Sequence, residues 1–454
     1  MRRLHTKELT ALECRQLLTK PSFDHVALGE GAKHRIRQVF GKELTAAEVV
    51  NKIVGAVRER GDEAVLQYTK LIDGANVTAA TMEVQAGDIE AAYALVDSET
   101  LAAIRQAAAN VRRFHAEQLP KSWFTEREHG SLLGQKYIPL ERVGIYVPGG
   151  TATYPSSVIM NAIPAAVAGV QEIIMAVPPA KDGSVNPYVL VAARESGVSR
   201  IFKIGGAQAI AALAFGTDLV PKVDKITGPG NIFVTLAKKA VYGYCDIDML
   251  AGPSEILIVA DQTADKRYIA ADMLSQAEHD VLASSILLTD SAELAAAVEE
   301  ELAVQLARLP RKEIAEQALQ QNGLILVTET VLEAMELANL SAPEHLEILT
   351  ADPFGLLPYV KHAGAVFLGP WSPEPLGDYL AGPNHVLPTG GTARFYSVLN
   401  VETFMKKTSI IAYSRQALLA AGKQVIRLAE AEGLEAHANA IRVRRESTCS
   451  SDPV

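Results

Sequence analysis

The fold is decided by residues 142–179, RVGIYVPGGTATYPSSVIMNAIPAAVAGVQEIIMAVPP. Two short apolar runs, RVGIYV and EIIMAV, each end in proline or glycine, and an apolar stretch of helical length separates them. A short apolar run that ends in turn residues is typical of a buried strand. The stretch therefore predicts a strand, a helix and a second strand, which together form the unit of a parallel sheet.

The same alternation continues to residue 261. RIFKI leads through GG into AQAIAALAFG, DKIT leads through GPG into NIFVTLAKKAVYG, and DIDMLAGPSEILIVAD closes the series. Nearly continuous apolar runs are expected of strands that are buried on both faces of a sheet. Ligands of such sheets bind beyond the carboxyl ends of the strands, where these glycine and proline turns lie.

The flanking segments carry further helix and strand patterns. Residues 45–118 favour helices, because Thr45 and Glu48 fit a capping box, apolar residues follow at helical spacing, and Gly61 is a plausible stop. Beyond residue 261, apolar patterns predict a second α/β unit, with helices over 264–280, 292–309 and 312–321, strands over 284–289 and 323–328, and a glycine- and proline-rich loop over 370–391.

Composition narrows the function classes. The 454 residues are 48% apolar and 21% charged, which is typical of a globular protein of two to four domains. The net charge of −10 leaves no polybasic face, so neither nucleic acid nor an anionic membrane is an expected partner. Cys14, Cys245 and Cys449 form no CxxC pair, which argues against sulfur-ligated zinc and a disulfide framework. With no secretory signal or membrane-length apolar run, we expect a reduced, cytoplasmic location.

Two short segments carry candidate catalytic or metal-binding groups. In SQAEHD, Gln276 and His279 share one helix face, and Gln276 falls on a buried stripe, where a polar group needs a partner such as a metal. The alternative is a helix end with an exposed polar face. In SAPEHLEI, Glu344 and His345 follow Pro343 in an expected loop, where they could act as general acid or base or could simply be solvated.

Two further segments add titratable groups. Asp378 and His385 lie in PLGDYLAGPNHVLPTGG, a loop too long and too glycine-rich for a simple connection. Glu432 and His437 lie in EAEGLEAHANAIRVR. Histidine, aspartate and glutamine side chains together suit zinc, which takes nitrogen and oxygen ligands, although HExxH is absent. GxGxxG is absent as well, and the PGGTAT and TGPGN turns either approach a phosphate or are turns without a ligand.

Taken together, these segments resemble histidinol dehydrogenase. The matching pieces appear in family order over roughly residues 25–445: VGIYVPGGTATYPSSVIMNAIPAAVAGV, GGAQAIAALAFGT, TGPGN, AGPSE, SQAEHD, APEHLE, GPWSPEPLGDYLAGPNHVLPT and AHANA. The resemblance implies oxidation of L-histidinol to L-histidine through the aldehyde, by two successive NAD-dependent steps at the end of histidine biosynthesis.

The resemblance also implies roles for individual residues. Glu344 and His345 would be the acid/base pair, and one Zn²⁺ per subunit would be held by Gln276, His279, Asp378 and His437. NAD contacts would include Tyr146, Gln208 and Asn231. Substrate contacts would include Ser254, Gln276, His279, His345, Asp378, His385, Glu432 and His437. The family is a homodimer, so Glu432 and His437 would complete the partner's pocket.

These roles are chemically coherent. An unperturbed imidazole has a pKa near neutrality, so His345 is suited to take the alcohol proton, and Glu344 as a carboxylate can activate the water of the second step. Zinc does no redox chemistry and would orient the substrate by chelating its imidazole and amino nitrogens. Glu432 is a natural partner for the cationic amino group.

Three alternatives compete with this interpretation. A family member could oxidise another small polar alcohol, such as a sulfonated diol, although Glu432 would repel an anionic substrate. A non-catalytic, two-lobed small-molecule binding protein and a phosphate-transfer enzyme are the others, and the second lacks GxxxxGK[ST].

The expected fold class is α/β, with two Rossmann-like parallel-sheet domains and small helical pieces at both ends. We expect an N-terminal helical piece over 1–24 and a first, discontinuous α/β domain over 25–141 and 256–390 that carries the zinc and acid/base residues. A second α/β domain over 142–255 would form the NAD-binding side, and a C-terminal piece over 391–454 would reach the partner's site.

Overall fold

The computed structural model describes residues 1–20, 28–149 and 154–446, and it forms two compact units. Unit 1 comprises Met1–Gln118 and Leu140–Phe404, and unit 2 comprises Leu119–Pro139 and Met405–Val454. Part of the PGGTAT turn, the polar tail with Cys449 and the expected boundary at residues 24 and 25 lie outside the described residues.

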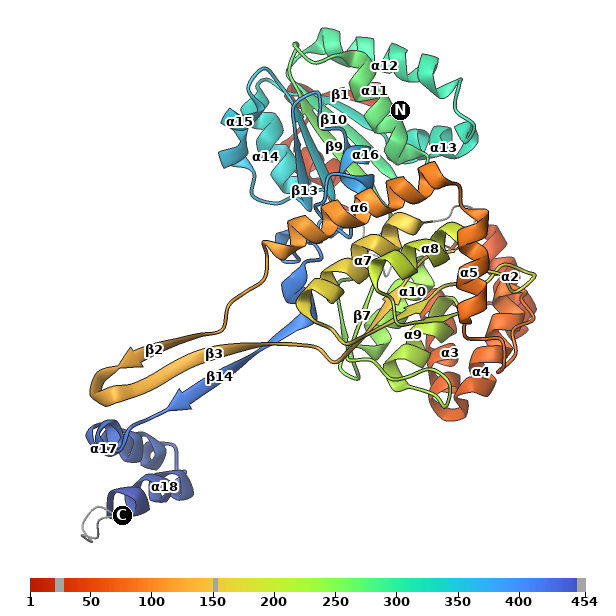
Figure 1. Cartoon of the computed structure of the whole chain (residues 1–454). Helices are drawn as coiled ribbons and strands as arrows, with labels where there is room; N and C mark the ends of the chain where they lie inside the picture. The colour runs from red at the N-terminus through yellow and green to blue at the C-terminus, as the bar shows by residue number, and fades with distance from the viewer. Residues whose placement is uncertain (21–27, 150–153, 447–454) are drawn as a thin grey trace. The chain divides into compact units, whose positions relative to one another are not determined.

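Unit 1 contains a five-stranded parallel sheet that confirms the predicted alternation of strands and helices (Figure 1). Its order is β6-β5-β4-β7-β8. Successive strands run from β4 outward to β6, and the chain then returns to add β7 and β8 on the other side of β4. Its strands are β4 (Arg142–Tyr146), β5 (Glu172–Ala176), β6 (Arg200–Phe202), β7 (Lys225–Thr227) and β8 (Asp246–Ile247), and the helices between them are α7 (Pro155–Ala168), α8 (Pro187–Ser196), α9 (Gly206–Phe215) and α10 (Ile232–Val241).

Local sequence explains where these helices begin and end. The Asn186 side chain accepts a hydrogen bond from the Tyr188 N–H at the start of α8, and Asn231 caps α10 in the same way. Gly169 and Gly197 end α7 and α8 in the left-handed conformation, which a residue without Cβ adopts at little cost.

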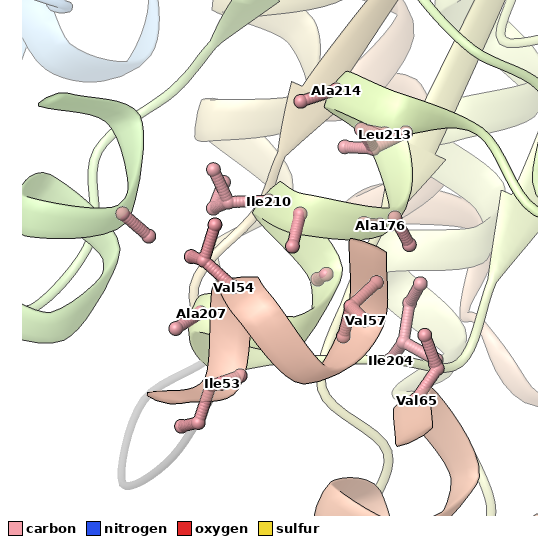
Figure 2. Close-up of a cluster of buried hydrophobic side chains, with 14 of the residues drawn as sticks. Ile53, Val54, Val57, Val65, Ala176, Ile204, Ala207, Ile210, Leu213 and Ala214 are labelled. Atoms are coloured by element: carbon pink, nitrogen blue, oxygen red, sulfur yellow. The ribbon is translucent and has the colours of Figure 1, made fainter. Parts of the chain in front are cut away.

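The helices between residues 30 and 116 pack mainly on the helices of the five-stranded sheet. They are α2 (Glu30–Phe40), α3 (Ala46–Arg60), α4 (Asp62–Tyr68), the π-helical turn η3 (Thr69–Asp73), α5 (Ala86–Leu95) and α6 (Ser98–Ala116). The predicted capping box of Thr45 and Glu48 is present. Figure 2 shows Ile53, Val54 and Val57 of α3 against Ile210 and Leu213 of α9 in one buried cluster. Each such side chain contributes about 1.5–3 kcal/mol when fully buried.

This packing differs from the expected division, which joined residues 25–141 to 256–390. An amphipathic stripe predicts that a helix buries one face, but it does not identify the surface that covers it. Here that surface is formed by α9 and α10, within the segment 142–255.

A six-stranded parallel sheet forms the other half of unit 1, as the second α/β pattern predicted. Its order is β1-β11-β10-β9-β12-β13. The strands are β1 (Arg2–His5), β9 (Glu255–Ala260), β10 (Ser284–Thr289), β11 (Leu324–Val327), β12 (His345–Leu349) and β13 (Ala365–Leu368). Around them lie η1 (Thr6–Glu8), α1 (Ala11–Leu18), α11 (Lys266–Ala277), α12 (Ala292–Leu306), α13 (Lys312–Asn322), α14 (Val331–Ser341), α15 (Pro353–Leu356), η5 (Leu357–Tyr359), α16 (Glu374–Tyr379), η6 (Thr392–Arg394) and η7 (Val401–Phe404).

The N-terminal piece is therefore helical only in part. Arg2–His5 forms an edge strand that pairs in parallel with Leu324–Val327, whereas α1 carries the expected helix and begins with a capping box of Thr10 and Glu13. The sequence RRLH has no apolar run, so nothing in it marks a strand. Its backbone groups gain ladder hydrogen bonds from β11, which a sequence pattern does not reveal.

Unit 2 is an antiparallel sheet with two helices. Figure 1 shows β2 (Trp123–Arg127), β3 (Ser131–Pro139) and β14 (Met405–Ala412) side by side, with β3 in the centre and η4 (Glu128–Gly130) joining β2 to β3. Helices α17 (Arg415–Ala431) and α18 (Glu435–Glu446) follow β14. Residues 119–139 thus pair with the C-terminal piece and not with the expected first domain. Most of these strand residues are exposed or half-exposed, so they lack the apolar run that identifies a buried strand.

Among the described helices, none combines the length and the apolar character needed to cross a membrane.

Candidate functional site

Glu344 and His345 lie at the amino end of β12, a central strand of the six-stranded sheet. The sequence predicted a loop here, but His345 is the first residue of the strand, and both side chains are buried. Ala342 ends α14 in the left-handed conformation with φ 50°, which agrees with the predicted break in the helix before Pro343. A strained, buried backbone therefore leads directly into the pair.

The backbone of Glu255, at the amino end of neighbouring β9, holds both side chains. Its N–H donates to Glu344 Oε2 at 2.8 Å, and its carbonyl oxygen lies 2.9 Å from His345 Nδ1. A carbonyl oxygen only accepts, so Nδ1 of His345 carries the proton and Nε2 keeps its lone pair. Nε2 is buried and has no hydrogen-bond partner among the described residues.

Burial gives these two groups unusual proton affinities. Burial, with smaller contributions from the nearby His385 and His279 rings, lowers the pKa of His345 to about 4, against the opposing effect of the Glu255 carbonyl. The imidazole is therefore neutral at pH 7 and able to accept a proton. Burial also raises the pKa of Glu344 well above its ordinary value, with Glu255, Asp378 and Glu374 adding to the effect and the Glu255 N–H opposing it.

Helix α16 brings two more carboxyl groups to the pair and corrects the prediction that 370–391 is loop throughout. Glu374 and Asp378 lie four residues apart on this helix and therefore share a face. One ligand atom from each of them and one from His345 all lie within 4.8 Å of one another. Burial raises the pKa of Glu374 to about 9 and that of Asp378 to about 6, and the two carboxyl groups hydrogen-bond each other.

Gln276 lies near the end of α11, the helix that contacts α16 through Ser275. Ser275 Oγ donates to Glu374 Oε2 at 3.4 Å, which joins the end of α11 to α16. The side chain of Gln276 is 0% exposed, and neither its Oε1 nor its Nε2 has a hydrogen-bond partner among the described residues. His279 lies two residues beyond the last helical residue, so the shared helix face predicted for it is replaced by a turn in which its N–H bonds to the Gln276 carbonyl.

His385 lies beside α16. Its Nδ1 is 3.1 Å from the Asp378 carbonyl oxygen, so Nε2 is again the free nitrogen, and burial lowers the pKa of the ring to about 4. A cavity of about 490 Å³ is lined by His345, Asp378 and His385 together with apolar side chains such as Phe367. This volume falls in the usual range for small-molecule sites.

The sequence did not single out three further buried carboxyl groups, those of Glu374, Glu347 and Asp272. The Glu374 N–H donates to Glu347 Oε1 at 2.8 Å, and Glu347 shares a hydrogen bond with Asp272. A signal for Glu347 was available, because HLEIL places a carboxylate inside an apolar strand. Glu374 gave none, because its segment was interpreted as a loop.

The donor set fits a cation such as zinc. Imidazole nitrogen and carboxylate oxygen are zinc ligands, His345 and Glu374 of the group each have an unpartnered buried atom, and the amide of Gln276 is buried without a partner. Of the four predicted ligands, Gln276 and Asp378 lie on helices that contact each other, and His279 follows the first of them. His437 lies on α18 and Glu432 at the end of α17, both exposed on unit 2.

The three predicted NAD residues lie at the carboxyl ends of the five-stranded sheet. Tyr146 ends β4, Gln208 lies in the first turn of α9 after β6, and Asn231 caps α10 after β7. Gly228 in the turn before Asn231 has φ 114°, and a Cβ there would lie 2.1 Å from the Tyr146 carbonyl oxygen. Only glycine lets these two turns approach so closely.

Ser254 lies in the segment that leads from this edge to the surroundings of Glu344 and His345. Ser254 directly precedes Glu255, and its carbonyl oxygen accepts from the Ser284 N–H at 3.0 Å. Thr389 Oγ1 accepts from the Gly252 N–H at 2.5 Å, and Thr235 of α10 donates to the Ala251 carbonyl at 2.9 Å. The segment between the two sheets is thus held from both sides.

Comparison with known proteins gives a consistent result. The family model described as histidinol dehydrogenase matches residues 37–445. The chain is 57% identical to the histidinol dehydrogenase of Heliobacterium mobile over 431 residues, which cover 95% of this chain and 99% of that one. It is 58% identical to the Halalkalibacterium halodurans enzyme of the same name over 397 residues, 87% of this chain and 93% of that one.

A solved structure agrees. The crystal structure of histidinol dehydrogenase from Elizabethkingia anophelis superposes with a TM-score of 0.89 at 37% identity, covering 99% of this chain and 98% of that chain. An oxidoreductase family that matches nearly the whole chain leaves no room for the binding-protein and phosphate-transfer alternatives.

Proposed function

Because the chain belongs to the histidinol dehydrogenase family, an oxidoreductase family of histidine biosynthesis, we propose that its site oxidises L-histidinol to L-histidine with one zinc ion and two NAD. The observation that carries this proposal is the orientation of His345. Its Nδ1 is tied to the Glu255 carbonyl, and its unpartnered Nε2 lies 3.9 Å from Glu374 Oε1, in a group with Asp378. The arrangement offers a neutral base next to a cation-binding set of ligands.

Gln276, His279 and Asp378 would hold the zinc ion together with His437. When bound, zinc supplies a fixed positive charge that chelates and orients the substrate's imidazole and amino nitrogens. Ser254, His345 and His385 would contact the substrate, and Glu432 would accept from its cationic amino group. His385 presents its free Nε2 because its Nδ1 is tied to the Asp378 carbonyl.

Tyr146, Gln208 and Asn231 would contact NAD. When bound, NAD accepts a hydride in each of the two oxidations, so one alcohol, one water and two NAD⁺ give one carboxylate, two NADH and three protons. The Asn231 side-chain oxygen already accepts from the Phe233 and Val234 N–H groups, so its amide nitrogen is the group left for a ligand.

His345 would act in the first step as the base. Its Nε2 takes the hydroxyl proton of the primary alcohol as the carbon loses its hydride. A pKa lowered to about 4 keeps the imidazole unprotonated at pH 7. It also makes the group a weaker base than a free histidine, so the step relies on the orientation that Glu255 gives the ring.

Glu344 would act in the second step. It takes a proton from the water that adds to the aldehyde carbon, and loss of hydride from the resulting hydrate gives the acid. A carboxyl group with a raised pKa is a stronger base than an ordinary glutamate, which suits it to this transfer. Holding the aldehyde between the two steps keeps a reactive species from leaving.

We further propose a homodimer with shared sites in the cytoplasm. Glu432 and His437 are polar side chains at the exposed end of a helical pair, and both fit a role in a partner's pocket. Cys14 and Cys245 are free thiols, in keeping with a reduced compartment.

The direct test is a histidinol and NAD assay on the purified protein. We expect two NADH per histidinol, loss of activity on chelation and recovery with zinc. If no NADH forms, the proposed reaction is wrong. An unchanged rate after thorough metal removal would overturn the metal assignment alone.

The shared site has its own test. Dimers of His437→Ala and of His345→Ala should each be inactive, and exchange of their subunits should restore activity, because one mixed site then has both histidines. No recovery after confirmed exchange would contradict the shared site.

A further inference from the structure

A second cluster of buried polar groups lies at the carboxyl ends of β4 and β6. The Gly206 N–H donates to the Tyr146 hydroxyl oxygen at 3.1 Å. Gln208 Nε2 donates to Asp73 Oδ2 at 3.1 Å. Tyr146 and Gln208 are 3% and 0% exposed. The sequence analysis had no role for Asp73, which reaches this edge from the N-terminal helices.

Gln208 has one polar atom without a partner. Its Oε1 is buried and accepts no hydrogen bond among the described residues, whereas its Nε2 is occupied by Asp73. Leaving a buried acceptor unpaired costs about 1–3 kcal/mol, so the site favours a ligand that donates to it. Gly206 lies against the same atom, since a Cβ there would be 2.9 Å from Gln208 Oε1 and the residue has φ 59°. A side chain at this position would crowd the free oxygen.

The backbone that carries Asp73 is unusual. Asp73 is the last residue of η3, a π-helical turn that continues α4, and Gly74 follows it with φ 70°. π-helical turns are rare and are often found at functional sites. This one ends the helix so that its last carboxylate meets α9.

The charge of Asp73 decides which end of the Gln208 amide is free. Burial raises the pKa of Asp73 to about 6, against the opposing effects of Arg35 and of Gln208 itself, so the group is ionised at neutral pH. An ionised carboxylate only accepts hydrogen bonds. It therefore selects the NH₂ end of Gln208 and leaves the oxygen for the ligand.

We propose that Asp73 is a positioning residue of the dinucleotide site: it fixes the Gln208 amide so that Oε1 accepts a hydrogen bond from an N–H or O–H group of NAD. The inference rests on the proposed function, which assigns Gln208 to NAD. The carboxamide NH₂, the adenine amino group and the ribose hydroxyls of NAD are the groups able to donate in this way. Asp73 acts through Gln208 and takes no part in proton transfer.

The test compares Asp73→Ala and Asp73→Asn with the wild type in the zinc-loaded, full-length enzyme. Asp73→Ala frees the amide to rotate, so we expect KM for NAD to rise about tenfold, which is the loss of one hydrogen bond. We expect kcat within about twofold, and KM for histidinol and zinc content unchanged. Asp73→Asn should have a smaller effect, because its oxygen still accepts from Gln208 while its own NH₂ competes for Oε1.

Asp62→Asn is the matched control. Asp62 begins α4, and its carboxylate accepts from Thr217 Oγ1 and from the Leu219 N–H at 3.1 Å. It therefore joins the same helix to the segment after α9, away from Gln208. We expect this variant to lower stability without changing KM for NAD. If Asp73→Ala does not fold, the asparagine variant answers the question with the same measurements.

A titration with NADH, followed by NADH fluorescence, distinguishes a failure of the proposed function from a failure of the inference about Asp73. If wild-type protein forms no NADH from histidinol, the proposed function is wrong, and the NADH affinities of the variants still test Asp73. If the wild type is active and Asp73→Ala keeps both KM for NAD and the NADH affinity, the inference is wrong. Equal losses in kcat, in both KM values and in zinc content of Asp73→Ala would also overturn it, because they would make the role of Asp73 structural.

Discussion

Apart from the edge strand β1, the two parallel sheets of unit 1 have the same strand order, and they place their candidate functional residues at opposite ends. In the five-stranded sheet, Tyr146, Gln208 and Asn231 follow the carboxyl ends of β4, β6 and β7. In the six-stranded sheet, Glu344 and His345 lie at the amino end of β12, beside Glu255 at the amino end of β9. One fold therefore offers two chemically different edges.

The difference follows from what each edge presents. Carboxyl ends meet glycine turns and helix N-termini, whose N–H groups and partial positive charge suit phosphates and neutral donors. Amino ends meet helix C-termini, whose partial negative charge favours cations, and α11 ends there with Gln276. The edge at Glu344 and His345 is accordingly built from imidazole and carboxylate side chains, and the other from glycine turns, helix N-termini and uncharged polar side chains.

The largest effect is expected at the amino-end edge. His345→Asn removes the nitrogen that we propose takes the alcohol proton, so kcat should fall by about 10²–10⁴-fold. NADH affinity should stay unchanged, because the change lies at the other sheet. Steady-state kinetics and NADH titration measure the two quantities. A parallel loss of NADH binding would mean that the edges are not separate.

Glu344→Gln should separate the two oxidations. Its amide oxygen still accepts from the Glu255 N–H, which wild-type Oε2 does at 2.8 Å, so the pocket is preserved while the base is lost. We expect aldehyde oxidation to fall about 100-fold and alcohol oxidation by only a few-fold. Single-turnover rates from histidinol and from the aldehyde give the comparison. Equal losses in both steps would remove the proposed role of Glu344.

The sequence predicted β4 to β7 and β9 to β11, because burial on both faces produces apolar runs with turns between them, but it interpreted the start of β12 as a loop and indicated no strand at β13. It also located Gln276, whose amide interrupts an apolar stripe. It could not find β1, β2, β3 or β14, because RRLH and the half-exposed strands have no such signature. The places of Glu374 and Asp73 depend on tertiary contacts. Glu374 lies on a helix inside a segment that was interpreted as a loop. Asp73 meets Gln208 of α9, and the apolar pattern of the N-terminal helices did not identify α9 as their packing partner.

Gly228→Ala should affect the carboxyl-end edge and spare the other. An added Cβ would lie 2.1 Å from the Tyr146 carbonyl oxygen, and φ 114° strains any side chain, so the turn must shift. We expect KM for NAD to rise about tenfold with zinc content and kcat nearly unchanged. Metal analysis and kinetics on the same preparation measure this. A drop in zinc content equal to the loss of NAD binding would contradict the division.

The smallest effect concerns the contacts that Asn384 makes with α7 and with His115 of α6. Asn384 Nδ2 donates to the Met160 carbonyl of α7 at 2.7 Å and lies 3.4 Å from Nε2 of buried His115 on α6. Burial lowers the pKa of His115, so the unfolded chain binds its proton first and stability falls as pH drops below about 6.5.

When the pH falls from 7.5 to 5.5, the free energy of unfolding of His115→Gln should therefore drop less than that of the wild type. The difference between the two proteins should be less than about 1.4 kcal/mol per pH unit. His345 and His385, whose pKa values burial also lowers, keep part of the dependence. Denaturant unfolding at both pH values measures the difference. The control is His34→Gln, a change at an exposed histidine, which should leave the pH dependence of stability unchanged. An equal change in both variants would contradict the specific effect of His115.

The most direct test is to measure zinc per chain and NADH affinity together in Gln276→Leu and Gly228→Ala. Gln276→Leu should lose zinc and bind NADH as the wild type does, and Gly228→Ala should show the opposite pattern. Loss of both ligands together in either folded variant, or retention of zinc in Gln276→Leu, would contradict the assignment of the two edges.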